Sequence, residues 1–322
     1  MLKFQHGRVI VNRRVSLYLR GASRLAEISL RIIRRSIVAG TIALWFGLTA
    51  DAPPKPVLGG DPRVARDGSR ILFRSERSGK SQIYVMKPDG SDVRQLTSDT
   101  SGAWSASWSP DGKRVVFVGG GNQITIMNAD GTEPHVVSAL EGDQGPSWSP
   151  DGSKILFASG KFPNINIYAM NSDGTGRRNI SPNPGFDYDP AFSPDGTLIA
   201  FVTGVRGQGV KVSVMNADGS GRRRLTNSEY SEERPTWSPD GTQIAYQAST
   251  RRPRLPESYV HIVNVRTGTD RRVGEHDKLQ LDETPSWFPD ASRLAIQSDR
   301  DGTWSVYVID LQGAVLSRLT SP

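Results

Sequence analysis

Trp148-Ser-Pro-Asp-Gly152 is one of six related stretches that recur along this chain of 322 residues. The other five also place an aromatic or apolar residue directly before a tight turn: Val64–Gly68, Trp108–Gly112, Phe192–Gly196, Trp237–Gly241 and Trp287–Ala291. The first residues of these stretches, the anchors, follow one another at spacings of 44, 40, 44, 45 and 50 residues. A nearly constant period in this range is typical of a repeat architecture.

Each repeat predicts four short antiparallel strands. An apolar run of strand length, such as Ile155–Phe157, follows the turn, and a second run, such as Ile167–Met170, follows a polar loop. In the Ser-Pro-Asp-Gly turn, proline presets φ and glycine supplies a positive φ. A later Asp-Gly turn leads into a closing strand. The sequence therefore predicts an all-β fold, a six-bladed β-propeller of four-stranded antiparallel blades with each anchor wedged between blades.

The repeat also resembles that of a known family. The succession of Trp-Ser-Pro-Asp-Gly, Ile-Ala-Phe, a strand ending in Met-Asn-Ala-Asp-Gly, and Leu-Thr is similar to the repeat of TolB-type, WD-like β-propellers, and it covers residues from about 57 to 322. The resemblance implies the same six-bladed fold. We expect a propeller without the α/β domain that precedes the propeller of TolB itself.

The first 52 residues are expected to be an export signal or anchor with a short linker, and the propeller to occupy residues 53–322. Residues 1–50 hold nine Lys or Arg and one acidic residue, and residues 36–50 form an uncharged, mostly apolar stretch. This length fits the core of a signal peptide, about 7–15 residues, better than a membrane span of about 20. We expect a periplasmic or otherwise exported protein that contacts the membrane only if this segment is retained.

The basic pI of about 9.7 does not indicate nucleic-acid binding. Beyond residue 50 the chain has 31 basic and 32 acidic residues, so the excess positive charge comes from the N-terminal segment. A nucleic-acid-binding domain would carry its basic residues on the folded domain itself. The predicted propeller is close to neutral, and we expect no nucleic-acid partner.

No catalytic or cofactor motif stands out. The chain has no cysteine, which excludes disulfides, thiolate metal sites and cysteine nucleophiles. Its four histidines have no metal-ligand spacing, and no Gly-x-Ser-x-Gly motif is present. Asp-Gly turns such as Asn128–Gly131 lack the other ligands of a calcium loop. We therefore expect no catalytic residues, no metal and no cofactor.

Acidic residues gather in the segments that connect one repeat to the next. Connections in a meander alternate between its ends, so these segments are expected on one face of the disc, opposed only by Arg234 and Lys278. The resemblance to TolB-type propellers implies that the strand entering each anchor is innermost, which would place these acids round the mouth of the central channel. A carboxylate cluster can attract a cationic partner or hold a divalent cation; ordinary solvated loops would give the same composition. The candidate partner-binding residues are Asp143, Asp187, Asp189, Glu232, Glu233, Asp282 and Glu283.

These observations predict a non-enzymatic, monomeric scaffold that binds a protein or peptide at the channel mouth. The resemblance to TolB-type propellers, which bind a peptidoglycan-associated lipoprotein, implies an envelope lipoprotein as partner and a role in cell-envelope maintenance. Two alternatives remain open. One is a propeller-type hydrolase or lyase with a carboxylate-bound metal in the channel, and the other is a glycan-binding module.

Overall fold

The computed structural model describes residues 4–5, 8–9, 58–140, 142–183, 185–205, 209–250, 257–275 and 280–320. The chain divides into two compact units, Met1–Phe46 and Gly47–Pro322. In the first unit, β1 (Phe4–Gln5) and β2 (Arg8–Val9) pair antiparallel. The expected export segment otherwise lies outside the described residues and stays a prediction. No described helix is both long and apolar enough to cross a membrane.

The second unit repeats one antiparallel meander. Four sheets have four strands each, in chain order from the first strand to the last. Their strands are β3 (Gly60–Val64), β4 (Ile71–Ser75), β5 (Gln82–Met86) and β6 (Arg94–Gln95); β7 (Trp104–Trp108), β8 (Arg114–Gly119), β9 (Gln123–Asn128) and β10 (His135–Ser138); β19 (Ser231–Trp237), β20 (Gln243–Ser249), β21 (Ser258–Asn264) and β22 (Asp270–Arg272); β23 (Asp282–Trp287), β24 (Arg293–Ser298), β25 (Ser305–Asp310) and β26 (Val315–Arg318).

An eight-stranded sheet lies between the second and third of these sheets in sequence. Its strands are β11 (Gln144–Trp148), β12 (Lys154–Lys161), β13 (Asn164–Asn171), β14 (Arg178–Asn179), β15 (Phe186–Phe192), β16 (Leu198–Val205), β17 (Gly209–Asn216) and β18 (Arg223–Arg224). It contains the meander twice, as β11–β14 and β15–β18. One parallel bridge, between Ile165 and Phe186, joins the two halves.

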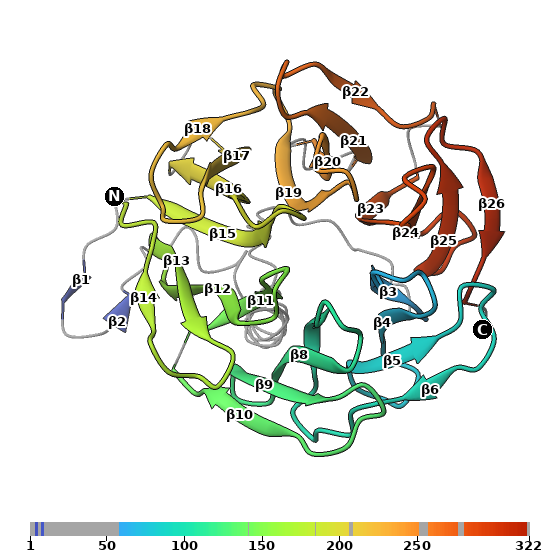
Figure 1. Ribbon diagram of the computed structural model, residues 1–322, viewed down its shortest axis with the longest axis horizontal. Helices are drawn as coiled ribbons and strands as arrows, with labels where there is room; N and C mark the ends of the chain where they lie inside the picture. The colour runs from blue at the N-terminus through green and yellow to red at the C-terminus, as the bar shows by residue number, and fades with distance from the viewer. Residues whose placement is uncertain are drawn as a thin grey trace. The chain divides into compact units, whose positions relative to one another are not determined.

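The structure confirms the predicted all-β propeller with antiparallel four-stranded blades. Figure 1 shows the meanders following one another round a ring, with the closing strands β6, β10, β22 and β26 at its outer edge. The blades pack face to face through continuous runs of buried side chains, as in β5, whose five residues are all buried. Burial on both faces explains why the sequence shows apolar runs instead of strict alternation.

Each tryptophan anchor is buried against the preceding blade. Trp108 packs with Leu72, Ile83 and Val85 of the preceding sheet. Its indole N–H donates to the carbonyl oxygen of Arg63 at 3.0 Å, and that residue directly precedes the anchor of the preceding repeat. The indoles of Trp237 and Trp287 reach the equivalent carbonyls at 3.0 and 3.3 Å. The anchors therefore fix the position of one blade on the next.

The ring closes without exchange of a strand between its first and last blades. Both β3–β6 and β23–β26 are complete sheets made from consecutive strands. The backbone N–H groups of Leu58 and Gly59 donate to the Trp304 carbonyl oxygen at 3.0 and 3.1 Å. At Gly59 there is no room for a side chain, because a Cβ would lie 2.7 Å from the Thr320 hydroxyl oxygen. Close backbone approach and apolar packing therefore close the ring.

Candidate functional site

The first strand of every meander carries a β-bulge that aims side chains toward the centre of the ring. The residue three positions before each anchor has a positive φ, although only one of these residues is glycine: Asp61, Ser105, Gly145, Asp189, Arg234 and Thr284. The ladder register shifts at the same places. Bulges turn a side chain away from its regular direction and often lie beside functional sites.

Five charged residues from these bulges form a group that we call the central cluster: Asp61, Asp189, Glu233, Arg234 and Glu283. Arg234 is its only cation, and its guanidinium lies 3.5 Å from an Asp61 oxygen and 3.7 Å from an Asp189 oxygen. Asp61 and, with smaller effects, Asp189 and Glu233 raise the pKa of Arg234. Arg234 therefore keeps its charge and links blades β3–β6, β15–β18 and β19–β22.

Asp61 and Asp189 are the paired acids of the central cluster. The Arg74 Nε also lies 3.6 Å from Asp61. Burial would raise the pKa of Asp61, but the positive charges of Arg234, Arg74 and Arg63 outweigh it and lower that pKa. These two carboxylates therefore have their compensating charge within the protein.

Glu233 and Glu283 differ from Asp61 and Asp189 in their partners, which are a hydroxyl and an amide group. Glu233 accepts a long hydrogen bond of 3.4 Å from the Tyr188 hydroxyl, and Glu283 accepts one of 3.5 Å from the Gln297 amide. Within the described part of the chain, neither has a Lys or Arg nitrogen at ion-pair distance. Burial, then the charge of Asp189, raises the pKa of Glu233. Burial, then the charges of Glu233 and Asp61, raises the pKa of Glu283 to about 8.

The other four candidate acids are buried inside their own blades. Asp143, Asp187, Glu232 and Asp282 each lie five residues before an anchor, and each is paired with a cation. Arg177 holds Asp143 through hydrogen bonds of 2.8 and 3.0 Å, and Arg222 holds Asp187 in the same two-pronged way. These carboxylates therefore cannot add exposed negative charge to the channel mouth.

Glu232 and Asp282 are satisfied by other partners. Glu232 accepts hydrogen bonds from the Val212 backbone, the Ser228 hydroxyl and the Thr226 hydroxyl, and it pairs with Lys211 at 3.5 Å. Asp282 pairs with Arg300. Of the seven candidates, the structure thus brings Asp189, Glu233 and Glu283 together at the centre of the ring. Asp61 and Tyr188 belong beside them but were missed by sequence reasoning.

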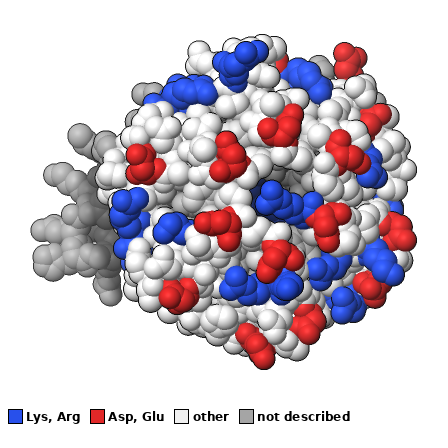
Figure 2. Space-filling model, in the orientation of Figure 1, with Lys and Arg blue, Asp and Glu red and all other residues white. Residues whose placement is uncertain are grey.

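The surface charges on one face of the propeller agree with the burial of four of the candidate acids inside their blades. Figure 2 shows acidic and basic side chains interspersed round a hollow at the centre of the face, without a patch of one sign that spans it. Some cations are used within the fold: Arg74 pairs with Asp61, and Arg77 lies over the rings of Phe73 and Tyr84. Glu233 and Glu283, the candidate acids for which no ion pair is seen among the described residues, both belong to the central cluster.

The described residues form no group of three or more His, Asp or Glu side chains placed to hold a metal ion. His261 is buried beside Asp270, at 3.3 Å, and between the rings of Tyr230 and Tyr246. Tyr246 also donates to Asp270 at 2.8 Å. This histidine is part of the packing of blade β19–β22.

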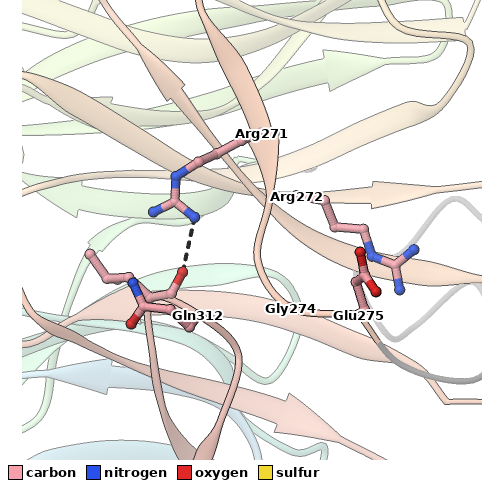
Figure 3. A pocket seen from close by; sticks show the side chains of 6 residues that line it. Arg271, Arg272, Gly274, Glu275 and Gln312 are labelled. Carbon is pink, nitrogen blue, oxygen red and sulfur yellow. Dashed lines mark hydrogen bonds between the residues drawn. The ribbon is translucent and has the colours of Figure 1, made fainter.

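A separate hollow of about 580 Å³ lies at the outer edge of the ring, between β22 and the turn that joins β25 to β26. Arg271 donates to the Leu311 carbonyl oxygen at 2.9 Å across it, and Figure 3 shows Arg272 beside Glu275 on the other side. Arg272 also lies over the ring of Tyr259, 3.6 Å from its centroid. Arg271 therefore joins the two blades, whereas Arg272 packs within its own blade.

Comparison with known proteins gives one family. The family model described as the TolB beta propeller domain matches residues 56–174, 133–252 and 204–322. A "Protein TolB homolog" of Chlorobium luteolum is 35% identical over 141 residues, which are 42% of this chain and 32% of the relative. The match thus spans about a third of that relative's length.

Two solved structures show the same fold at low sequence identity. TolB from Acinetobacter baumannii superposes with a TM-score of 0.68 at 22% identity, covering 80% of this chain and 65% of that one. An oligogalacturonate lyase in complex with manganese superposes with a TM-score of 0.57 at 17% identity, covering 79% and 74%. At these identities the likeness is one of fold, since the same propeller carries both a TolB protein and an enzyme.

Proposed function

Because the chain belongs to the TolB β-propeller domain family, we propose that it is an exported, non-enzymatic scaffold that binds a protein or peptide partner at the centre of its ring. We count the eight-stranded sheet as two blades, which makes the propeller six-bladed. The basic and then apolar composition of the N-terminal segment supports export. By analogy with TolB, the partner is a cell-envelope protein, with an envelope lipoprotein as the first choice.

The observation that carries this proposal is the uncompensated pair Glu233 and Glu283. Both carboxyl groups have a raised pKa, because burial and neighbouring negative charge disfavour their ionised forms. A Lys or Arg side chain or an N-terminal amine from a partner would supply the missing positive charge. Asp61 and Asp189 already share Arg234, so we assign partner binding to Glu233 and Glu283, with Asp189 in support.

The binding test is a double variant, Glu233→Gln with Glu283→Gln. Glutamine keeps the size of each side chain and cannot ionise beside a cationic partner, so proteins that co-purify with the native exported chain should be lost or strongly reduced. Glu229→Gln is the matched control, because Glu229 is exposed and lies in the connection that leads into β19, the strand of Glu233.

If the same proteins co-purify equally with the double variant, the central cluster does not bind the partner. Recovery should be measured quantitatively by mass spectrometry at matched protein loading. Equal thermal stability of the variant and the native chain would show that loss of a partner is not loss of the fold.

The pH dependence of stability gives a second test of the central cluster. Between about pH 4.5, the ordinary value, and about pH 8, folded Glu283 holds a proton that the unfolded chain releases. Stability therefore falls as pH rises through this window. In Glu283→Gln the loss of stability over this pH range should be smaller than in the native chain, because of these two glutamates only Glu233 still takes part. Above pH 8 the variant should be more stable than the native chain, on the order of 1–3 kcal/mol.

Denaturant titrations from pH 5 to pH 9 would measure this difference. The comparison between the two chains removes the contribution of the aspartates whose pKa is lowered, because both chains share them. Parallel stability curves for native protein and variant would contradict the assignment of a raised pKa to Glu283.

The second candidate function is a metal-dependent enzyme, because an oligogalacturonate lyase of the same fold has been solved in complex with manganese. The described residues supply no group of three or more candidate ligands, so the donor set does not support this alternative. A chelator that lowered the thermal stability of the purified protein would favour it over the scaffold.

A further inference from the structure

Two of the repeats use arginine to cover the next anchor on the turn face of the propeller. Arg70 and Arg114 each lie six residues after an anchor and reach the anchor of the next blade. The guanidinium carbon of Arg70 is 4.6 Å from the ring centroid of Trp108, and that of Arg114 is 4.6 Å from Trp148. Arg70 also donates to the Gly112 carbonyl oxygen at 2.7 Å. Each guanidinium is thus held by a cation–π contact.

Blade β15–β18 lacks this arginine. The residue six positions after its anchor is Leu198, whereas the other repeats have Arg70, Arg114, Lys154, Gln243 and Arg293 there. The next anchor, Trp237, is oriented as Trp108 is, since each indole donates at 3.0 Å to the carbonyl directly before the preceding anchor. Leu198 packs against the cluster that contains Trp237, so this blade has a leucine where two other blades place an arginine over the next anchor.

A pocket of about 320 Å³ lies at this place, between the Ser-Pro-Asp-Gly turns of the two blades. Its lining includes Pro194, Asp195, Leu198, Trp237, Asp240 and Gly241. Gly241 is the counterpart of Gly112, so its carbonyl offers the kind of acceptor that Arg70 uses. The pocket thus combines apolar walls, an indole and two carboxylates.

The two aspartates keep their negative charge in this setting. The Ser193 hydroxyl, then the Thr197 backbone N–H, lowers the pKa of Asp195, and the equivalent groups of Ser238 and Thr242 do the same for Asp240. Both side chains are exposed at the turn tips. The equivalent Asp67 and Asp111 carry the same charge beside Arg70 and Arg114, whose positive charges contribute to their lowered pKa values.

We propose that this pocket binds the guanidinium group of an arginine side chain presented by a partner protein. The internal repeats suggest the occupant, because two of them place a guanidinium, Arg70 or Arg114, over the equivalent tryptophan beside the equivalent turn. Arginine fits better than lysine, since its planar group can lie against the pocket wall and still donate to the Gly241 carbonyl and to the aspartates. The proposal does not depend on the central cluster. The two cluster residues on β19, Glu233 and Arg234, come before Trp237, which is the last residue of that strand.

The test uses the tripeptide acetyl-Gly-Arg-Gly-amide as the probe and the indole N–H signal of Trp237 as the reporter. The chain has seven tryptophans, so Trp237→Phe identifies the signal by its loss. The arginine probe should shift the Trp237 signal in a saturable manner at millimolar concentration. The lysine version of the probe should bind several-fold more weakly.

Leu198→Arg supplies a guanidinium from the chain itself, as in the repeats of Arg70 and Arg114. The variant should abolish the shift, whereas Leu198→Met, with an uncharged side chain of similar size, should keep it. The double variant Glu233→Gln with Glu283→Gln should also keep it, which separates this pocket from the proposed function. An arginine probe that does not move the Trp237 signal, or that moves it equally in Leu198→Arg, would overturn the proposal.

Discussion

Replacement of Trp148 by alanine is expected to lower the free energy of unfolding by about 3–5 kcal/mol. Trp148 is 7% exposed and packs between Val116, Ile124 and Ile126 of the preceding blade and Ile155 and Phe157 of its own. Truncation would leave a cavity at a blade interface that rigid strands cannot collapse to fill. The guanidinium of Arg114, 4.6 Å from the ring centroid, would also lose its contact.

Lys113→Ala is a suitable control, because Lys113 is exposed beside the preceding turn. Its free energy of unfolding should change by less than about 0.5 kcal/mol. Chemical denaturation at one pH, with the slope compared between variants, would measure both effects. Equal midpoints for Trp148→Ala and Lys113→Ala would mean that the anchor does not hold the blades together.

The sequence predicts the blade topology well because the signals are local and repeated. A Ser-Pro-Asp-Gly turn specifies a reversal from its own residues, and apolar runs of strand length specify what lies between reversals. Each repeat alone is short, but recurrence at similar spacing makes an accidental match implausible. The anchors, the turns and the order of strands within each blade therefore follow from the residues alone.

Side-chain direction in the first strands is harder to predict. A regular strand would alternate, whereas the bulge leaves the residues two and three positions before the anchor outside the ladder. Glu232 consequently turns into its blade and Glu233 toward the centre. A sequence signal for the bulge exists: proline stands two positions before every anchor except Trp108, and proline within a sheet indicates an edge or a bulge.

Ring closure and ion pairing depend on contacts that are distant in sequence. Leu58 and Gly59 meet Trp304 almost at the other end of the chain. Arg177 reaches Asp143 across 34 residues, and Arg222 reaches Asp187 across 35. Arg177 and Arg222 each end an Asp-Gly-x-Gly-Arg stretch, but this pattern does not say which acid each arginine reaches. The recurrence of an acid five residues before four anchors could have suggested a structural role, since four repeats share it.

The pair formed by Asp143 and Arg177 gives the other large effect. Arg177→Met should lower the free energy of unfolding by about 3–5 kcal/mol, because it leaves a buried carboxylate without its cation. The Asp143 side chain has no exposed surface, and the Ser138 hydroxyl, which donates to it at 2.5 Å, cannot replace a positive charge. Methionine keeps much of the packing of Arg177 against Phe157 and Tyr168.

A second variant separates lost charge compensation from lost packing. Arg177→Met combined with Asp143→Asn removes both charges and keeps a side chain that can accept from Ser138, so it should recover more than half of the stability lost in Arg177→Met. The coupling between the two changes, read from a double-mutant cycle, measures the pair. If the double variant is as unstable as Arg177→Met, packing and not charge explains the loss. If the refolded double variant retains its partner, Asp143 belongs to the fold and the binding role rests with Glu233 and Glu283.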